Sequence, residues 1–459
     1  MNRRIGIALV VVVIILAYPV AAWLIGLSAE HTWQQREQQV AQRYPFFETM
    51  KREYHRGVYS STEEVTYGFG EHFAKSMQAL TGGEPAPGLQ ITVRNTIHHG
   101  PLPQLRAFAP ATIDTEVILP PQIRQKLAAL FGNKASLSIK TRLHWLGGTT
   151  TSFYSPAFEQ KTPEGVMIAW RGLDGTTDVG SDLGYQKGKI TAPGLSVKAA
   201  KGNVSVQDIR LATDLRSTAF EGISLGTIDM SLARLDLEQT ASGEKTSLQN
   251  LALNSKSSAQ GEYLDFDLGL NADAIQVKQF NLTHVGYEVR ATHLHGPSVA
   301  TMNKSIQAMQ AQSTTTPDPA KMLGILKTDG VELLLHDPVL ELPRIGFAMP
   351  EGELLISIKA SAHGFTRAEL DGPPGELKGA IAKHLDASAD LRIDTALLDR
   401  LLDTSGNADK FTAQLQGLQR QGYLKLDGKA LTTHLAFTGG QLQVNGLPFP
   451  PQPPAGGHP

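Results

Sequence analysis

Apolar and polar residues alternate one by one in stretch after stretch between about residues 57 and 297. In residues 136–145, SLSIKTRLHW, Leu143 and Trp145 fall on one face of an extended strand and Arg142 on the other. This alternation is typical of a strand that packs on one side and meets water on the other. Helical stretches that could connect parallel strands do not recur here, so the pattern predicts a long, curled antiparallel sheet.

One stretch changes the phase of its alternation twice. In ISLGTIDMSLARLDL, residues 223–237, the apolar residues move from odd to even positions and back again. A slip of one residue turns every following side chain to the other face. The stretch therefore predicts bulges or turns near Gly226 and Ala233.

The predicted fold class is mainly β (α+β), with a few packed helices between and after the strands. Helical patterns fall at residues 119–132, 298–328 and 394–421, and a terminal meander follows them. The predicted organisation is a cytoplasmic stub and transmembrane anchor at 1–29, a helical stalk at 30–56, a first β-rich region at 57–297, a helical connector at 298–328, a second β-rich region with helices at 329–447 and a Pro-rich flexible tail at 448–459.

Residues 5–27, IGIALVVVVIILAYPVAAWLIGL, carry no charge. A helix of this length would span about 35 Å, enough to cross a bilayer. Arg3 and Arg4 precede it, so the positive-inside rule predicts a cytoplasmic N-terminus and an exported remainder. The alternative is a signal peptide cleaved after Ala22. The apolar run continues past Ala22, which favours the uncleaved anchor.

Composition excludes several classes of protein. The chain has no cysteine, which removes disulfide frameworks, thiolate zinc sites, cysteine nucleophiles and iron–sulfur clusters. The formal net charge is −2, which gives no indication of a nucleic-acid partner.

Two ten-residue segments resemble one another. VRNTIHHGPL at 93–102 and VRATHLHGPS at 289–298 share six identical positions. One hypothesis is a metal site built from both segments, because imidazole is a common zinc ligand. Adjacent strand residues point to opposite faces, however, and no HExxH pattern accompanies the histidines.

We therefore predict a structural corner used twice, with strands ending at Gly100 and Gly296 and with His99 and His295 in equivalent places. The motif residues are His98, His99, Gly100, Pro101, His293, His295, Gly296 and Pro297.

Catalytic and cofactor motifs are weak or missing. The chain has no GxSxG elbow. Asp174, Asp178 and Asp182 recur at every fourth position but lack the spacing of a calcium loop. The sequence predicts no catalytic residue, no metal and no cofactor, and it favours a non-enzymatic protein.

Four features together resemble the YdgA family of Gram-negative bacteria, a domain of unknown function. They are the single anchor, YHRGVYSS at 54–61, IHHGP at 97–101 and the closing GYLKLDGKALTTHLAFTGGQLQVNGLPF at 422–449. The resemblance implies an inner-membrane protein with a periplasmic domain and implies no reaction. The long amphipathic strands are also similar in architecture to AsmA-type envelope proteins, which are thought to handle lipid.

Three functions remain open at this point. The first is a membrane-tethered periplasmic scaffold or binding module that could form a homo-oligomer or bind an envelope protein. The second is the handling of lipid or another hydrophobic ligand on an apolar sheet face. The third is an enzyme whose site one sequence does not reveal. A continuous open apolar patch would distinguish the second from the first.

Overall fold

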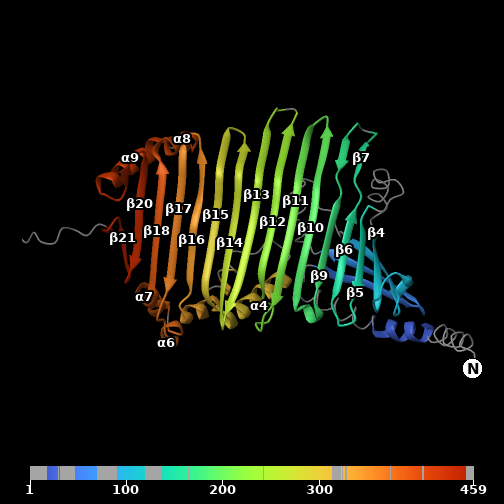
Figure 1. Cartoon of the computed structure of the whole chain (residues 1–459). Helices are drawn as coiled ribbons and strands as arrows, with labels where there is room; N and C mark the ends of the chain where they lie inside the picture. Colours follow the sequence, from blue (N-terminus) through green and yellow to red (C-terminus); the bar gives the residue numbers. More distant parts are fainter. Residues whose placement is uncertain are drawn as a thin grey trace, which may run out of the picture.

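The computed structural model describes residues 18–28, 30, 47–69, 90–118, 136–163, 165–240, 242–312, 322, 324–325, 328–372, 374–405 and 408–450. The strands in these residues form one open antiparallel sheet of 22 strands, and helices lie at its margins (Figure 1). The protein is therefore mainly β, as the alternation predicted.

The strands are β1 (Phe47–Arg56), β2 (Ser60–Phe69), β3 (Gln90–His99), β4 (Ala111–Ile118), β5 (Ser138–Leu143), β6 (Thr149–Ser155), β7 (Phe158–Lys161), β8 (Met167–Trp170), β9 (Leu173–Val179), β10 (Tyr185–Ala199), β11 (Gly202–Ser217), β12 (Ser224–Gln239), β13 (Lys245–Gln260), β14 (Tyr263–Val277), β15 (Phe280–His295), β16 (Val339–Met349), β17 (Gly352–Ala362), β18 (Leu385–Asp394), β19 (Lys425–Asp427), β20 (Ala430–Thr438), β21 (Gln441–Val444) and β22 (Leu447–Phe449). The helices are α4 (Gly296–Gln312), α6 (Arg367–Leu370), α7 (Pro374–His384), α8 (Thr395–Ser405) and α9 (Ala408–Arg420), with short 3₁₀ helices η1 (Pro103–Leu105), η2 (Ser181–Leu183) and η3 (Gly330–His336).

Most strands pair with their neighbours in sequence. β1 to β6 pair in order, β6 pairs with β9, and β9 pairs with the first half of β10. The second half of β10 pairs with the short β7–β8 hairpin. From β10 the order runs without interruption to β18, which then pairs with β20. A meander of this kind needs only short connections.

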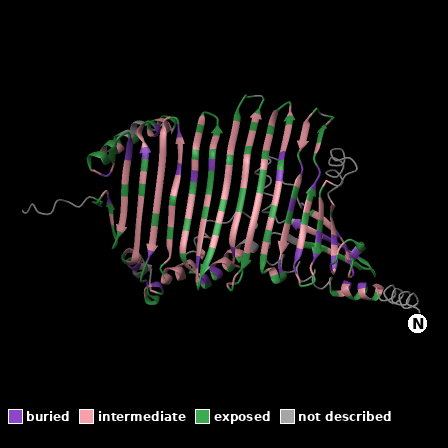
Figure 2. Ribbon diagram, viewed as in Figure 1, coloured by how far each residue is buried: buried purple, intermediate pink, exposed green. Residues whose placement is uncertain are grey.

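Buried apolar residues gather at the strand ends and among the N-terminal strands (Figure 2). One cluster joins Ile97, Ile113 and Leu143 across β3, β4 and β5. Leu143 exposes only 3% of its surface and Arg142 is exposed, which confirms the two faces predicted for this strand. Trp145 is 44% exposed because β5 ends at Leu143, before the predicted alternation does.

Several boundaries differ from the predictions. The predicted helical stalk at 30–56 does not hold from Phe47 onward, because β1 pairs with β2 along most of its length. Tertiary pairing outweighs the local helical composition there. The two β-rich regions form one sheet, since β16 pairs directly with β15 after α4. The first half of GVELLLHDPVLEL is η3 and not a strand.

Other predictions fall on residues outside the described ranges. They include the helix at 119–132, most of the second half of the connector, and the tail beyond 450. Within the described residues, no helix has both the length and the apolar character needed to cross a bilayer. Residues 5–17 of the apolar run lie outside the described part, and residues 18–28 are helical.

Candidate functional site

Two continuous rows of apolar side chains cross the sheet at right angles to its strands. Paired residues on neighbouring antiparallel strands project to the same face, so each row can be followed from pair to pair. The row that we call the lower row is Ile190, Leu211, Met230, Leu253, Leu270, Tyr287, Ile345, Ile356 and Leu391, from β10 to β18. The upper row is Phe158, Trp170, Leu195, Val206, Leu235, Leu248, Ile275 and Leu282, from β7 to β15.

Both rows lie on the same face of the sheet. Leu282 ends the upper row, Leu391 ends the lower row, and both pack in the cluster around Leu397 of α8. One helix cannot contact both faces of a sheet at once, so the two rows share the face that α8 covers. We call this surface the apolar face.

The apolar face is open over its centre. Met230, Leu270 and Tyr287 expose 40%, 38% and 40% of their surface. Helix packing on this face is concentrated at its margins, where α8 sits over the upper ends of β16 to β20 and Val299 of α4 packs near Leu264 at the lower ends (Figure 1). Five strand spacings by nine residues give an area of about 24 Å by about 30 Å, on the order of 700 Å². Patches of this size mark interaction surfaces.

A line of irregular positions lets both rows keep to one face. Neighbouring strands form no backbone pairs at Pro193, Asp208, Ala233, Asn250, Asp273 and His284, which lie side by side across β10 to β15. Asp208, Asn250 and His284 have φ near +50°. Such residues reverse the alternation locally. The irregularity predicted at Ala233 belongs to this line, and Gly226 has a φ of 145°.

The opposite face carries charged residues. Cross-strand ion pairs follow it from β10 to β17. They are Lys187 with Asp214, Arg290 with Asp267 and Glu341, and Lys359 with Glu341. The sheet therefore has one apolar and one charged side, and in the part of the chain that the structure describes the helices lie mainly at the ends of its strands.

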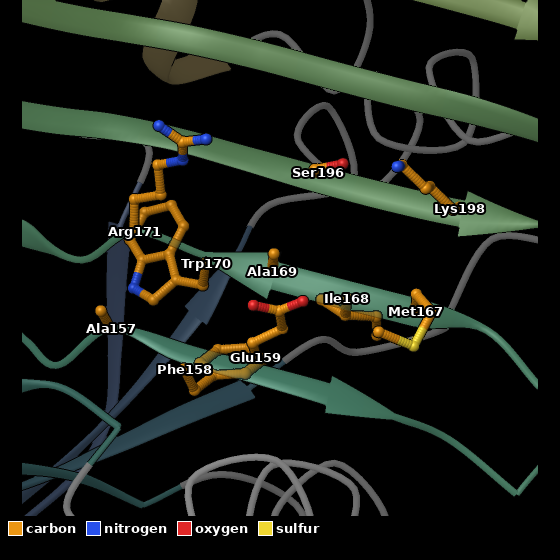
Figure 3. A pocket seen from close by; sticks show the side chains of 10 residues that line it. All are labelled: Ala157, Phe158, Glu159, Met167, Ile168, Ala169, Trp170, Arg171, Ser196 and Lys198. Carbon is orange, nitrogen blue, oxygen red and sulfur yellow. The ribbon is translucent and has the colours of Figure 1, made fainter.

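A pocket of about 700 Å³ lies where the β7–β8 hairpin meets β10 (Figure 3). Phe158 and Trp170 line it and also begin the upper row. Arg171, Lys198 and Glu159 contribute the charged groups. The pocket and the apolar face thus share two aromatic residues.

The first histidine motif receives the N-terminal helical segment. β3 ends at His99, one residue before the predicted end at Gly100, and His99 is 2% exposed. Its Nδ1 lies 3.0 Å from the carbonyl oxygen of Ala22, and its Nε2 lies 3.2 Å from Oγ of Ser61. Burial lowers the pKa of His99. The Tyr18 hydroxyl also donates to the carbonyl oxygen of Leu102, at 2.8 Å.

Both segments that meet in this contact, the helical residues 18–28 and the end of β3, have a glycine where a larger residue would be too close to its neighbours. Gly100 has a φ of 128°, and a Cβ there would lie 3.3 Å from Cβ of Ala22. A Cβ on Gly26 would lie 2.7 Å from the His99 ring. Pro101 follows in the turn that leads to η1. The neighbouring His98 faces the other way, where its ring lies 3.5 Å from the carboxylate of Asp114.

The second motif has a different environment. β15 ends at His295, directly before Gly296 and Pro297, but these two residues begin helix α4 instead of a turn. The His295 ring stacks on His336 at 3.6 Å between centroids, and His293 stacks on Tyr263 at 3.9 Å. Burial, followed by the charge of His336, lowers the pKa of His295.

A bulge explains why the two motifs diverge. Each arginine of the repeat forms ion pairs with both neighbouring strands, Arg94 with Glu64 and Glu116 and Arg290 with Asp267 and Glu341. His293 then adopts a φ of 59°, and the pairing of β14 with β15 shifts by one residue. His99 and His295 consequently do not occupy equivalent places, contrary to our expectation.

The four histidines do not converge on one point, because nine strands lie between β3 and β15 along the sheet. Among the residues that the structure describes, no group of three or more His, Asp or Glu is placed to hold a metal ion. The motif histidines instead make structural contacts, and only the first set receives the N-terminal segment.

Residues 1–452 match the family described as "Bacterial protein of unknown function (DUF945)". The chain belongs to this family. No curated protein and no solved structure matches the sequence significantly. Membership covers nearly the whole chain and assigns no biochemical role to this DUF945 protein.

Sequence reasoning gave an apolar sheet face only as one of three open functions and did not identify the residues that form it. Its strands were recognised by alternation, but the two rows depend on register between strands that one sequence does not give. The phase changes in residues 223–237 were the available signal, because they meant that apolar side chains stay on one side despite the bulge.

Proposed function

We propose that this protein binds lipid acyl chains, or ligands of the same chemistry, on the apolar face. The observation that carries the proposal is the open pair of apolar rows. The six strands from β10 to β15 span about 24 Å, whereas an acyl chain covers half of a bilayer core, about 15 Å. A whole acyl chain therefore fits along one row of apolar side chains.

The chemistry of the rows favours a lipid over a second protein chain. Within β10 to β15 both rows consist of Leu, Ile, Val, Met and a single Tyr. Protein interfaces are enriched in aromatic and Arg anchors and hold several hydrogen bonds, which these rows scarcely provide. Aliphatic side chains gain instead from any apolar surface that replaces water.

We also propose that the protein is held in the inner membrane by residues 5–27, with its sheet in the periplasm and a non-catalytic role there. The uncharged run behind Arg3 and Arg4 supports this. We further infer that the YdgA-family resemblance and DUF945 denote one family. A reporter fused after Gly446 should be active only if it works outside the cytoplasm. Release of the intact domain by osmotic shock would instead support cleavage after Ala22.

Site-specific photo-crosslinking tests the ligand proposal. Met230 and Asp229 are exposed neighbours on β12, and Asp229 accepts a hydrogen bond from Asn254 on the charged face. A benzophenone amino acid at position 230 should crosslink to lipid in cells, whereas the same group at 229 should not.

Two results would contradict the proposal. Crosslinks from position 230 to a second copy of the chain would favour the self-associating scaffold. Equal lipid labelling from both positions would show that the apolar face has no preference for lipid.

A further inference from the structure

Three turns of the N-terminal strands lie side by side at one edge of the sheet, at the lower right of Figure 1. They are residues 57–59 between β1 and β2, 100–110 between β3 and β4, and 144–148 between β5 and β6. The N–H of His99 at the end of β3 donates to the carbonyl oxygen of Tyr59 in the first turn. The helical residues 18–28 lie against the same edge, through the contact of Ala22 with His99.

The second and third turns expose large apolar side chains. Leu146 exposes 94% of its surface, Leu105 80% and Phe108 76%. The ring centroids of Phe108 and Trp145 are 5.4 Å apart, so the two turns form one surface. We call Leu102, Leu105, Phe108, Trp145 and Leu146 the turn cluster. Contact of these side chains with water is unfavourable, and contiguous exposed apolar residues of this kind mark an interaction surface.

The backbone of the second turn holds Leu105 in an unusual conformation. Gln104 and Leu105 have φ angles of 52° and 56°, a region that residues other than glycine seldom occupy. The Leu105 N–H donates to the carbonyl oxygen of Leu102 at 2.9 Å, and Nε2 of Gln104 lies 2.7 Å from Nε2 of His98. Strained positions of this kind persist where the side chain has a function. An exposed leucine gains nothing from water, so the strain indicates an apolar partner.

The helical residues 18–28 continue this exposed surface. Ala22 and Gly26 are buried against the end of β3, whereas Val20, Trp23 and Leu24 are exposed. The three exposed residues are spaced three and four apart and therefore share one side of the helix.

The same helix connects the turn cluster to the predicted anchor. The Tyr18 hydroxyl donates to the carbonyl oxygen of Leu102, at 2.8 Å. Tyr18 and Ala22 both belong to the uncharged run at residues 5–27. An anchor made from this run therefore brings the second turn to the membrane surface.

The composition of the three turns favours a lipid surface over a protein partner. They contain no Asp or Glu, and Arg106 is exposed beside Leu105. Tryptophan is enriched at the membrane interface, and arginine is attracted to anionic head groups. Single side chains that project from separate turns suit a fluid bilayer, whereas a protein interface has a packed core of matching shape.

We propose that the turn cluster inserts into the outer interface of the lipid bilayer that holds the anchor. This contact is separate from the apolar face and adds to the anchor at residues 5–27. It rests on the membrane location given under the proposed function. A second contact restricts how the sheet can turn about its anchor, and it assigns the edge of the sheet that stands on the membrane.

Fluorescent labelling of the full chain tests the proposal. Because the chain has no cysteine, a single new cysteine directs a nitrobenzoxadiazole dye to one position. Leu105→Cys and Leu146→Cys place it in the turn cluster, and the labelled protein is reconstituted in vesicles of phosphatidylethanolamine and phosphatidylglycerol. The emission should shift to shorter wavelength. Lipids that carry a nitroxide near the glycerol backbone should quench most of it.

Leu426→Cys is the matched control. Leu426 on β19 is also an exposed leucine, and β19 pairs with β20 at the other end of the sheet (Figure 1). A dye at this position should keep its long-wavelength emission and should not be quenched by the nitroxide lipids. Thermal melts verify that each variant is folded, and flotation with the vesicles verifies that each is membrane-bound.

The other outcomes contradict the proposal in different ways. Dyes at positions 105 and 146 that behave like the dye at 426 overturn the bilayer contact, while flotation leaves the anchor in place. A shift to shorter wavelength without nitroxide quenching means that protein covers the turn cluster, and the assignment to lipid is wrong. Equal quenching at 426 contradicts contact through one edge. If no variant floats with the vesicles, the proposed membrane location fails as well.

Discussion

The Nδ1 atom of His99 lies 3.0 Å from the carbonyl oxygen of Ala22, a residue 77 positions earlier in the chain. This contact joins the end of β3 to the helical residues 18–28, within the run predicted to be a membrane anchor. The second ring nitrogen of His99 faces Ser61 of β2. The histidine therefore fixes the helix against two strands, and its ring cannot turn without losing one of the partners.

We expect Gly26→Ala to weaken this junction. A new Cβ would lie 2.7 Å from the fixed ring of His99, whereas helix propensity alone would make the substitution favourable. The melting temperature of the full chain in detergent should fall, by an amount equivalent to about 1–2 kcal/mol. The control is Gly379→Ala in α7, where nothing lies within 4 Å. A stabilising effect at both glycines would mean that the helix does not dock at His99.

Stability should decrease as the pH falls below about 6.5, the ordinary pKa of histidine. Burial lowers the pKa of His99, so the unfolded chain takes up protons in a range where the folded chain still excludes them. The free energy of unfolding then decreases with decreasing pH. Melts at pH 7.5 and 5.5 should differ less for His99→Gln than for wild type. His55→Gln, at an exposed position, should leave the difference intact.

Leu143→Asp should disrupt folding, because a carboxylate would replace a 3% exposed side chain that packs with Ile97 and Ile113. The cost of burying it is several kcal/mol. Arg142→Asp, on the exposed side of the same strand, should cost about 0.5 kcal/mol. Circular dichroism melts of the two variants compare them directly, and equal tolerance would contradict the register of β5.

Gly226→Ala should be costly although it adds only one methyl group. The new Cβ would lie 1.9 Å from the carbonyl oxygen of Asp214, at a φ of 145° that other residues avoid. We expect a loss of more than about 2 kcal/mol. Gly269→Ala on β14 is the control, because its nearest atom would be 3.5 Å away. Similar denaturation midpoints for the two variants would show that β12 has another conformation at Gly226.

Local patterns predicted individual elements well. Alternation indicated β14, and the Leu-rich pattern after Asp394 predicted α8, which begins at Thr395. The sequence pattern wrongly predicted a helix at β1, because the charged residues of this strand resemble those of a solvated helix. In the structure Arg52 of β1 forms an ion pair with the buried Glu63 of β2. A partner eleven residues away decides the conformation there, and composition does not reveal it.

The site was harder to predict because it is a relation between strands. Met230 and Leu253 are adjacent on the apolar face only because β12 and β13 pair in one particular register. The histidine repeat shows the opposite difficulty. Identical letters at His99 and His295 lead to different environments, because one bulge at His293 shifts the register of the second copy.

The meander from β10 to β15 is a repeat of similar hairpins. Each of these strands pairs with its two neighbours and runs for 15 or 16 residues, so each hairpin resembles the next. Insertion or removal of one hairpin would change the width of the sheet by about 10 Å and leave the other pairings unchanged. The size of the surface can thus change in steps of two strands, while the helices at its margins keep their own packing.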